Sequence, residues 1–156
     1  MVLGRPDEYP RAKKLFDAGR HPTFIGPDMV ARHASTGGLL FATWEGADVA
    51  VALMNVRRSV LLVLTVVPAC QGYGLGDAIV RYVAPIWVRV IEANVPWFER
   101  RGFEAVGALK QGRTLRTQIM VHSDVRRLAG RVAESFGDRV ANGEDAEHSA
   151  ARDGGV

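Results

Sequence analysis

The first third of the chain changes from helical to extended patterns of hydrophobic residues. Apolar side chains recur at three- and four-residue spacing over 7–18, and Gly19 follows as a stop signal, which predicts a helix. Pro27 begins a shorter helical pattern over 27–33. Three apolar runs separated by short turns then predict an antiparallel meander of strands, over 39–45, 49–56 and 60–67.

The third of these runs is apolar at both odd and even positions. A strand of this kind is expected at the centre of a sheet that is covered on both faces. Pro68 ends the run, because proline cannot donate to a central ladder. The run has eight residues, whereas a membrane-spanning helix needs about 20. We therefore expect no membrane association.

The second half of the chain begins with a strand–helix–strand unit. A helix is predicted over 76–84, ended by Pro85, and a strand over 86–91. Such a crossover pairs the strands 60–67 and 86–91 in parallel. A short helix over 96–101 and a hairpin of 103–109 with 115–121 follow. The element order predicts a mixed α/β fold with one parallel junction.

Composition and charge indicate one basic globular domain followed by a polar, acidic carboxyl-terminal segment. Residues 123–137 show one apolar helical face, whereas 138–156 are polar, lack aromatics and predict a disordered acidic tail. From 138 onward there are five acids and two bases, against twelve acids and eighteen bases before it, so the globular part is basic. We expect a domain over 1–122, with amino-terminal helices at 7–34 and a core at 39–121. Its basic balance suits an anionic cofactor, with nucleic acid as an open alternative.

Cysteine content and the start of the chain bear on the compartment. Cys70 is the single cysteine, so no internal disulfide forms. The first residues contain no apolar run of signal-peptide length. We expect a cytoplasmic protein. No His/Cys cluster has metal-ligand spacing, so no metal site is predicted.

The loop at 71–76, Gln-Gly-Tyr-Gly-Leu-Gly, lies directly between the central strand and a helix. Backbone N–H groups in such a turn point to one spot, and the helix N-terminus adds partial positive charge. Glycines at 72, 74 and 76 permit positive φ and close approach of a bulky anion such as a pyrophosphate. The spacing fits neither the dinucleotide fingerprint nor the NTP-binding loop. A loop that merely turns the chain is the structural alternative.

Two segments resemble the GNAT N-acetyltransferases. Gln-x-x-Gly-x-Gly, after a strand that ends in Val66-Val67-Pro68, resembles that family's acetyl-CoA signature. The segment 94–103, Asn-Val-Pro-Trp-Phe-Glu-Arg-Arg-Gly-Phe, resembles the family helix that ends in Tyr-Glu-x-x-Gly-Phe. The resemblance spans about 39–121. The family's usual first strand is missing or vestigial.

The resemblance implies a GNAT-like, mostly antiparallel sheet with helices on both faces and a V-shaped splay between two central parallel strands. A bend at 65–68 would open that splay. Backbone groups of the loop would hold the pyrophosphate of acetyl-CoA or another acyl-CoA, and Val66 and Val67 would pair with the pantetheine arm. Asn94 would contact the same arm. The full set implied to bind the cofactor is Val66, Val67, Gln71, Gly72, Tyr73, Gly74, Leu75, Gly76 and Asn94.

The catalytic residues of the family are not matched. Phe98 stands where many members have a proton-donating tyrosine, and phenylalanine has no proton to give. The strand 60–67 contains no glutamate base, and Thr65 is its only hydroxyl. The substitutes that remain open are Tyr73, Tyr82, Glu45, His33 and His122. No catalytic residue is therefore assigned.

The functional hypothesis is an N-acyltransferase that moves an acyl group, usually acetyl in this family, directly from CoA to a primary amine in a ternary complex. The acceptor stays open between a small molecule, a protein amine and an amino group of a modified nucleic acid. A CoA-binding regulatory or interaction module without catalysis is the alternative, because the tyrosine and glutamate are missing. The helix over 123–137 is a candidate for docking on a partner or for forming a homodimer.

Overall fold

A computed structural model describes residues 1–20, 25–112 and 115–125. Residues 1–122 form one unit, and a second unit begins at Ser123. The predicted helix over 123–137 and tail over 138–156 fall mainly outside the described residues. The helices are Tyr9–Ala18 (α1), Pro27–Ala34 (α2), Leu75–Val83 (α3) and Val95–Glu99 (α4). The strands are Val2–Leu3 (β1), Leu39–Trp44 (β2), Ala47–Asn55 (β3), Val60–Val66 (β4), Trp87–Ile91 (β5), Phe103–Gln111 (β6) and Arg116–His122 (β7).

The strands form one sheet in the order β1-β2-β3-β4-β5-β7-β6, with β4 at its centre. Every neighbouring pair is antiparallel except β4 and β5, which are parallel. The predicted meander, central strand and parallel junction are confirmed, with strand ends that differ from the predicted ones by a few residues. The first strand is vestigial: β1 has two residues, which pair with Phe41 and Leu40 of β2.

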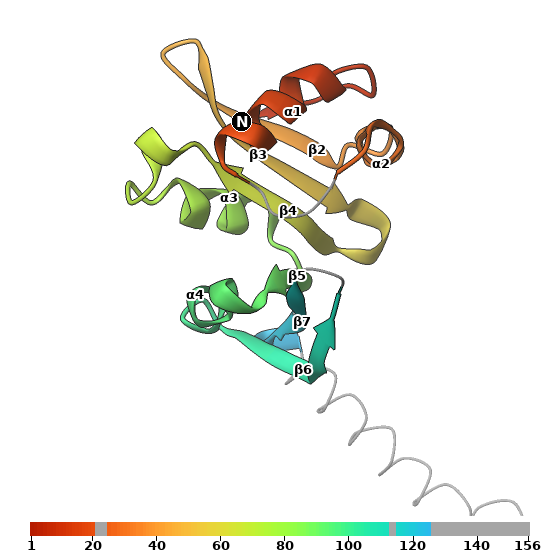
Figure 1. The fold of residues 1–156 in the computed structure, drawn as a ribbon, viewed down its shortest axis with the longest axis vertical. Coiled ribbons are helices and arrows are strands. Elements are labelled where there is room, and N and C mark those ends of the chain that lie inside the picture. The colour runs from red at the N-terminus through yellow and green to blue at the C-terminus, as the bar shows by residue number, and fades with distance from the viewer. Residues whose placement is uncertain (21–24, 113–114, 126–156) are drawn as a thin grey trace, which may run out of the picture. The chain divides into compact units, whose positions relative to one another are not determined.

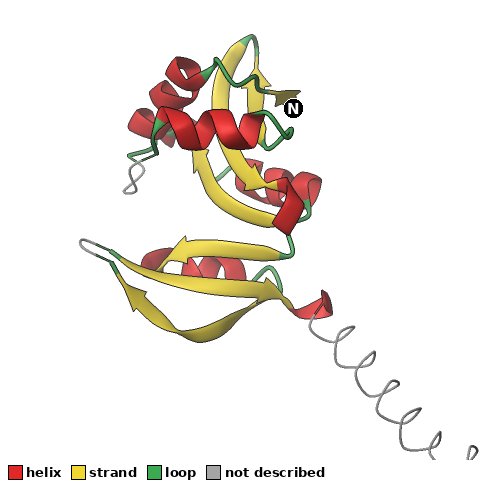
Figure 2. Cartoon of the chain, turned by 90° about the vertical axis from the view of Figure 1, so that its right-hand side faces the viewer, coloured by secondary structure: helices red, strands yellow, loops and turns green. Residues whose placement is uncertain are grey.

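Helices cover both faces of the sheet, as Figures 1 and 2 show. On one face α1 and α2 bury Leu15, Phe16 and Val30 against Phe41 and Leu53. On the other face Ile79 of α3 and Phe98 of α4 belong to a second apolar cluster, which contains Leu40, Ala52 and Leu61 from the same strands. Both faces of β4 are therefore covered, as its continuous apolar pattern predicts. No helix in the described part of the chain is long and apolar enough to span a bilayer.

The helix α1 is fixed to the sheet by a charged cluster as well as by apolar packing. The Arg11 guanidinium donates to both carboxylate oxygens of Asp48 on β3, at 2.7 and 2.6 Å, and to Glu8 at 2.8 Å. It also lies 4.0 Å from the centre of the Phe41 ring. The Arg11 contacts hold the pKa of Asp48 below its usual value. The pKa of Glu8 is lowered by the Arg5 backbone N–H, which donates to its carboxylate at 2.7 Å, and by Arg11. The cluster ties the amino-terminal turn of α1 to β3.

The parallel strands β4 and β5 meet only at their beginnings. Val60 pairs with Trp87 and Leu61 with Val88, and pairing then stops. At the same place the register between β3 and β4 shifts: Leu53 pairs with Val63 and Met54 with Leu61, so Leu62 is an extra, unpaired residue. Such a bulge bends the strand that contains it. The strands therefore part after Leu61, earlier than the predicted bend at 65–68.

Candidate functional site

Separation of β4 from β5 leaves one edge of β4 without a partner strand. The Val67 N–H donates to Val49 O of β3 at 2.9 Å. Because antiparallel ladder bonds involve alternate residues, the backbone groups of Val66 and Leu64 face away from β3, toward the open edge. The Val66 carbonyl is met there by the Gln71 side chain, whose Nε2 donates to it at 3.0 Å. This edge is available to an extended ligand that pairs as a strand would.

The loop after β4 presents backbone N–H groups without partners. Gly72 and Gly74 both adopt left-handed backbone conformations, with φ of 85° and 78°. Gly74 is the N-cap of α3 and has no side chain to cap it. Within the described chain, no N–H group from Gly72 to Asp77 donates to another backbone group. With the positive end of α3 behind them, these groups form a site for a phosphate anion.

A cavity of about 440 Å³, here called the loop cavity, lies between this loop and α4. Arg101 forms part of its wall, with its guanidinium carbon 3.4 Å from the centre of the Trp97 ring. Arg101 also donates to the Trp97 carbonyl at 2.6 Å and pairs with Asp77 in the first turn of α3. That pairing lowers the pKa of Asp77. The carboxylate therefore faces the anion site with its charge compensated.

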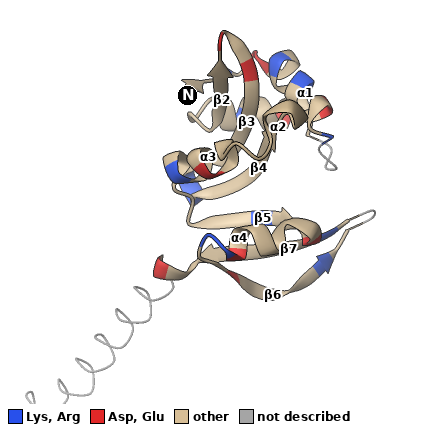
Figure 3. Ribbon diagram, turned by 90° about the vertical axis from the view of Figure 1, so that its left-hand side faces the viewer, with Lys and Arg blue, Asp and Glu red and all other residues tan. Residues whose placement is uncertain are grey.

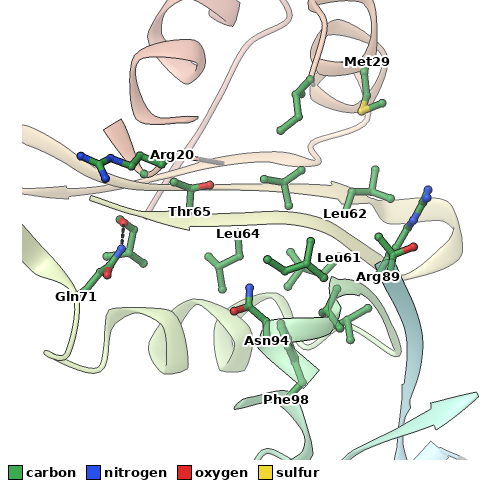
Figure 4. Close-up of a pocket in the computed structure, with 18 residues that line it drawn as sticks. Arg20, Met29, Leu61, Leu62, Leu64, Thr65, Gln71, Arg89, Asn94 and Phe98 are labelled. Atoms are coloured by element: carbon green, nitrogen blue, oxygen red, sulfur yellow. Dashed lines mark hydrogen bonds between the residues drawn. The ribbon is translucent and has the colours of Figure 1, made fainter. Parts of the chain in front are cut away.

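Most of the cofactor residues that the sequence predicts come together at the loop cavity: Val66, Gln71, Gly72, Gly74, Leu75, Gly76 and Asn94 line it. The Tyr73 side chain does not line it and is 82% exposed. Asn94 is the N-cap of α4, yet its amide makes no capping bond, and in Figure 4 it points toward β4. An amide that is not used for capping is free to contact a ligand.

In three details the structure differs from the arrangement that the sequence predicts for the cofactor residues. The Val67 N–H and carbonyl are both used, by Val49 and Cys70, and Val67 lines neither cavity of the site. The Gln71 N–H donates to Pro68 O at 3.2 Å, so it is also occupied. Gly76 is helical and has no positive φ. A Cβ there would lie 3.1 Å from the Trp97 ring, so glycine provides room for that ring.

A second cavity of about 410 Å³, the gap cavity, lies where β4 and β5 part. It is lined by residues from both faces of β4: Leu62, Val63 and Thr65 on the α1–α2 face, and Leu64 and Val66 on the α3 face. Leu64, Val66, Gln71, Asn94 and Phe98 line both cavities, so the two adjoin. Figure 4 shows Asn94 and Phe98 below β4 and Arg20 and Met29 above it. The gap cavity therefore connects the loop side of the sheet with the α1–α2 side.

Among the residues that the structure describes, no aspartate, glutamate, histidine, cysteine, lysine or tyrosine lines the gap cavity. Phe98, at the position of the family's tyrosine, is buried between Trp97 and Phe103, with ring centres at 4.8 and 5.6 Å. The five other candidate catalytic residues line neither cavity: Tyr73, Tyr82, Glu45, His33 and His122.

Sequence reasoning missed several residues of the site. Leu64 lies on the open edge of β4, but an apolar strand gives no sign of which residues lose their partner strand. Arg101 lies inside the Glu-Arg-Arg-Gly-Phe segment that resembles the family helix, and its positive charge is the signal that could have identified it. Arg20, Met29, Arg89 and Thr117 also line the gap cavity. They come from α2, β5, β7 and the turn after α1, and form no local motif.

Comparison with solved structures identifies the fold. Ard1 from Thermoplasma volcanium matches with a TM-score of 0.60 at 13% identity, covering 76% of this chain and 93% of that one. Arabidopsis thaliana Naa50, in complex with a CoA-Ac-MVNAL bisubstrate analogue, matches with a TM-score of 0.61 at 15% identity, covering 76% and 94%.

Rv2747 from Mycobacterium tuberculosis, solved with CoA, matches with a TM-score of 0.54 at 16% identity, covering 77% and 97%. No protein-family model and no curated protein matches the sequence significantly. Other structural neighbours are described as GNAT-family acetyltransferases. The chain therefore has the fold of the GNAT acetyltransferases.

Proposed function

We propose that this chain is an acyl-CoA-dependent N-acyltransferase that transfers an acyl group, with acetyl as the expected one, directly to a primary amine. The observation that carries the proposal is the gap cavity, which joins a phosphate-binding loop on one face of the sheet to a separate opening on the other. Structural neighbours solved with CoA or a CoA-based analogue support the same cofactor.

The residues present fit an acyl-CoA. The unpaired N–H groups from Gly72 to Asp77 suit its pyrophosphate, and the Asn94 amide and the open edge at Leu64 and Val66 suit the amide-containing arm. When bound, the acyl-CoA supplies an activated thioester carbonyl. The N–H group of Leu64 or Val66 on the open edge of β4 would donate to that oxygen and stabilise the negative charge that develops on it.

Proton transfer is not assigned to a side chain of the site. The gap cavity, as far as the described residues define it, is lined by apolar, amide, hydroxyl and arginine side chains. Arginine keeps its proton, and an unassisted threonine hydroxyl is a poor base. We therefore propose that water takes the proton from the amine, while the protein contributes mainly by positioning the two substrates.

The same lining favours one alternative, a CoA-binding module without turnover. Titration calorimetry with acetyl-CoA, followed by thiol release with a panel of amines, separates the two. The panel should contain amino acids, polyamines, aminoglycosides, lysine peptides and aminated DNA. Binding with amine-dependent thiol release supports the transferase. Binding without release for every amine supports the inactive module, and absence of binding contradicts both.

A further inference from the structure

The gap cavity contains an unusual charge pattern on the α1–α2 side of β4. Arg20 and Arg89 line it, and none of its described lining residues is an aspartate or glutamate. β4 holds no charged residue, and Arg89 is the single charged residue of β5 (Figure 3). We propose that one of these guanidinium groups recognises a negative group on the acceptor, which is then a small primary amine bearing a carboxylate or phosphate. The inference rests on the proposed function and adds the class of substrate.

Arg20 occupies a strained backbone position at the wall of the cavity. It follows α1 with a φ of 50°, a left-handed conformation that is costly for a residue with a side chain. Glycine usually takes such a position after a helix. Here the glycine stands one residue earlier, because a Cβ on Gly19 would lie 2.0 Å from the Thr65 methyl group. The close approach of α1 to β4 thus places the strained turn on Arg20.

The charge of Arg20 is not used within the described structure. The nearest acid along α1, Asp17, pairs through its side chain with Lys13 at 2.6 Å. Arg20 donates its backbone N–H to the Asp17 carbonyl at 3.1 Å, and no ion pair of its guanidinium occurs among the described residues. A free arginine at a cavity suits a planar anion, which it binds through two parallel hydrogen bonds.

Arg89 reaches the same cavity from β5. Its neighbours Val88 and Val90 are buried in the core, so Arg89 lies on the opposite face of the strand and is exposed. The nearby acid Glu92 pairs with Arg116 at 3.0 Å. No ion pair to Arg89 is found in the described part of the chain. Figure 4 shows Arg89 and Arg20 at opposite ends of the cavity, so one small anion is expected at one end and not between them.

Thr65 provides an independent sign of a polar ligand. It lines the gap cavity between the two arginines in Figure 4, and it is only 5% exposed. Its hydroxyl oxygen is buried and has no hydrogen-bond partner in the described structure. Buried hydroxyl groups nearly always have partners, because leaving one unpaired is costly. A polar group of the bound acceptor would supply the hydrogen-bond partner that the Thr65 hydroxyl lacks.

The charge pattern also argues against acceptors that carry several positive charges. A polyamine or aminoglycoside would meet two positive groups with no carboxylate to offset them, which is unfavourable in a cavity partly removed from water. The volume of about 410 Å³ is in the range of small-molecule sites. Part of that volume is needed for the acyl end of the cofactor. A small anionic amine fits the charge and the remaining space.

Pairs of amines that differ only in the negative group test the inference. Glutamate and its dimethyl ester, glycine and glycine amide, and phosphoethanolamine and ethanolamine are titrated into the CoA-loaded and the CoA-free protein. Thiol release from acetyl-CoA is measured with each amine. We expect at least one anionic member to bind about tenfold or more tightly than its neutral partner. Equal binding within every pair, or preference for polyamines, would overturn the inference.

Arginine variants locate the anion. Arg20→Gln and Arg89→Gln each remove one charge from the cavity, and Arg57→Gln removes one from an exposed turn outside both cavities. At least one cavity variant should lose the preference for the anion, whereas R57Q should keep it, and CoA affinity should stay within about twofold. Weaker CoA binding by R20Q and R89Q with unchanged amine preference would assign the arginines to the cofactor and contradict the inference. The amine titrations require no turnover, so absent thiol release counts against the proposed function and not against this inference.

Discussion

The two sides of β4 build their candidate binding groups in different ways. The loop cavity is formed largely by the backbone: unpaired N–H groups from Gly72 to Asp77, and glycines that make room or permit a left-handed turn. The α1–α2 side of the gap cavity is formed by side chains: Arg20, Met29, Thr65 and Arg89. The N–H groups of the first come from one continuous stretch of chain, residues 72–77. The second is assembled from several elements that are distant in the sequence.

This difference teaches where chemical specificity is encoded in the fold. A backbone site needs glycine at fixed places and a helix start, so it binds the same phosphate group in chains of very different sequence. A site built from side chains changes with every substitution on the elements around it. The loop therefore indicates the cofactor, and the residues across β4 indicate the acceptor.

The largest effect is expected from adding a carboxylate to the backbone-built side. Gly74→Asp places a negative charge at the N-terminus of α3, against the bound pyrophosphate, and should raise the Kd for CoA at least about 100-fold. Calorimetry measures the Kd and thermal unfolding measures the fold. Gly37→Asp is a matched control, because Gly37 has a similar φ of 75°, against 78° at Gly74, and open space around it. Micromolar CoA binding by G74D would remove the loop from the cofactor site.

A steric change should disturb the side-chain-built side alone. Gly19→Ala adds a Cβ that would lie 2.0 Å from the Thr65 methyl group, so α1 must shift from β4. Overpacking of this kind costs about 1–3 kcal/mol in the free energy of unfolding. The KM for the acceptor should rise, with little change in CoA affinity.

The double variant G19A/T65S tests the cause of that effect. Serine keeps the hydroxyl group but lacks the methyl group that the new Cβ would meet, so most of the lost stability should return. Denaturant unfolding of both single variants and the double variant measures this coupling. Strictly additive losses would show that the methyl contact is not responsible.

The same contrast explains which features the sequence predicts. The order of the sheet, the central position of β4 and the parallel junction follow from apolar periodicity and loop length, and all three are confirmed. The loop is contiguous, so its glycines are visible as a motif. The bulge at Leu62 leaves no such sign, because an extra leucine in an apolar strand looks like any other residue. The position where β4 and β5 part was therefore predicted too late in the strand.

Arg20 and Arg89 were not predicted for a related reason. Each is one of many arginines in a basic chain, and only the folded sheet brings both to one cavity. Phe98, in contrast, could be located from the sequence, because it lies in a contiguous segment that resembles the family helix. In the structure it is buried and lines both cavities. Its missing hydroxyl still leaves the proton donor unassigned.

The ion pair between Arg11 of α1 and Asp48 of β3 provides a pH-dependent test of how the α1–α2 side of the gap cavity is held in place. Asp48→Asn should lower the free energy of unfolding by about 1–2 kcal/mol. The Arg11 guanidinium then faces a neutral amide in place of the carboxylate that accepts two of its hydrogen bonds. The native pKa of Asp48 is lowered, so its stabilising effect is present above about pH 4 and is lost as the pH falls through the native pKa.

Thermal unfolding of wild type and D48N should therefore differ most between pH 5 and 8 and converge in acid. Acceptor binding should weaken in D48N more than CoA binding does, because α1 carries Gly19 and Arg20 to the gap cavity. A stability difference that grows on acidification would contradict the assigned role of the carboxylate.

The smallest expected effect concerns the unpaired hydroxyl group of Thr65. Thr65→Val keeps the shape of the side chain and removes the group that has no partner in the described structure. If the hydroxyl is only a buried defect, the variant is as stable as wild type or more stable, and the KM for the acceptor is unchanged. If it binds the acceptor, stability again does not fall, but the KM rises about three- to tenfold because one hydrogen bond to the substrate is lost. We expect the second result, with the Kd for CoA unchanged. Both cases predict no loss of stability, so the KM for the acceptor decides between them, and the unfolding and CoA titrations show that the variant is folded and binds the cofactor normally.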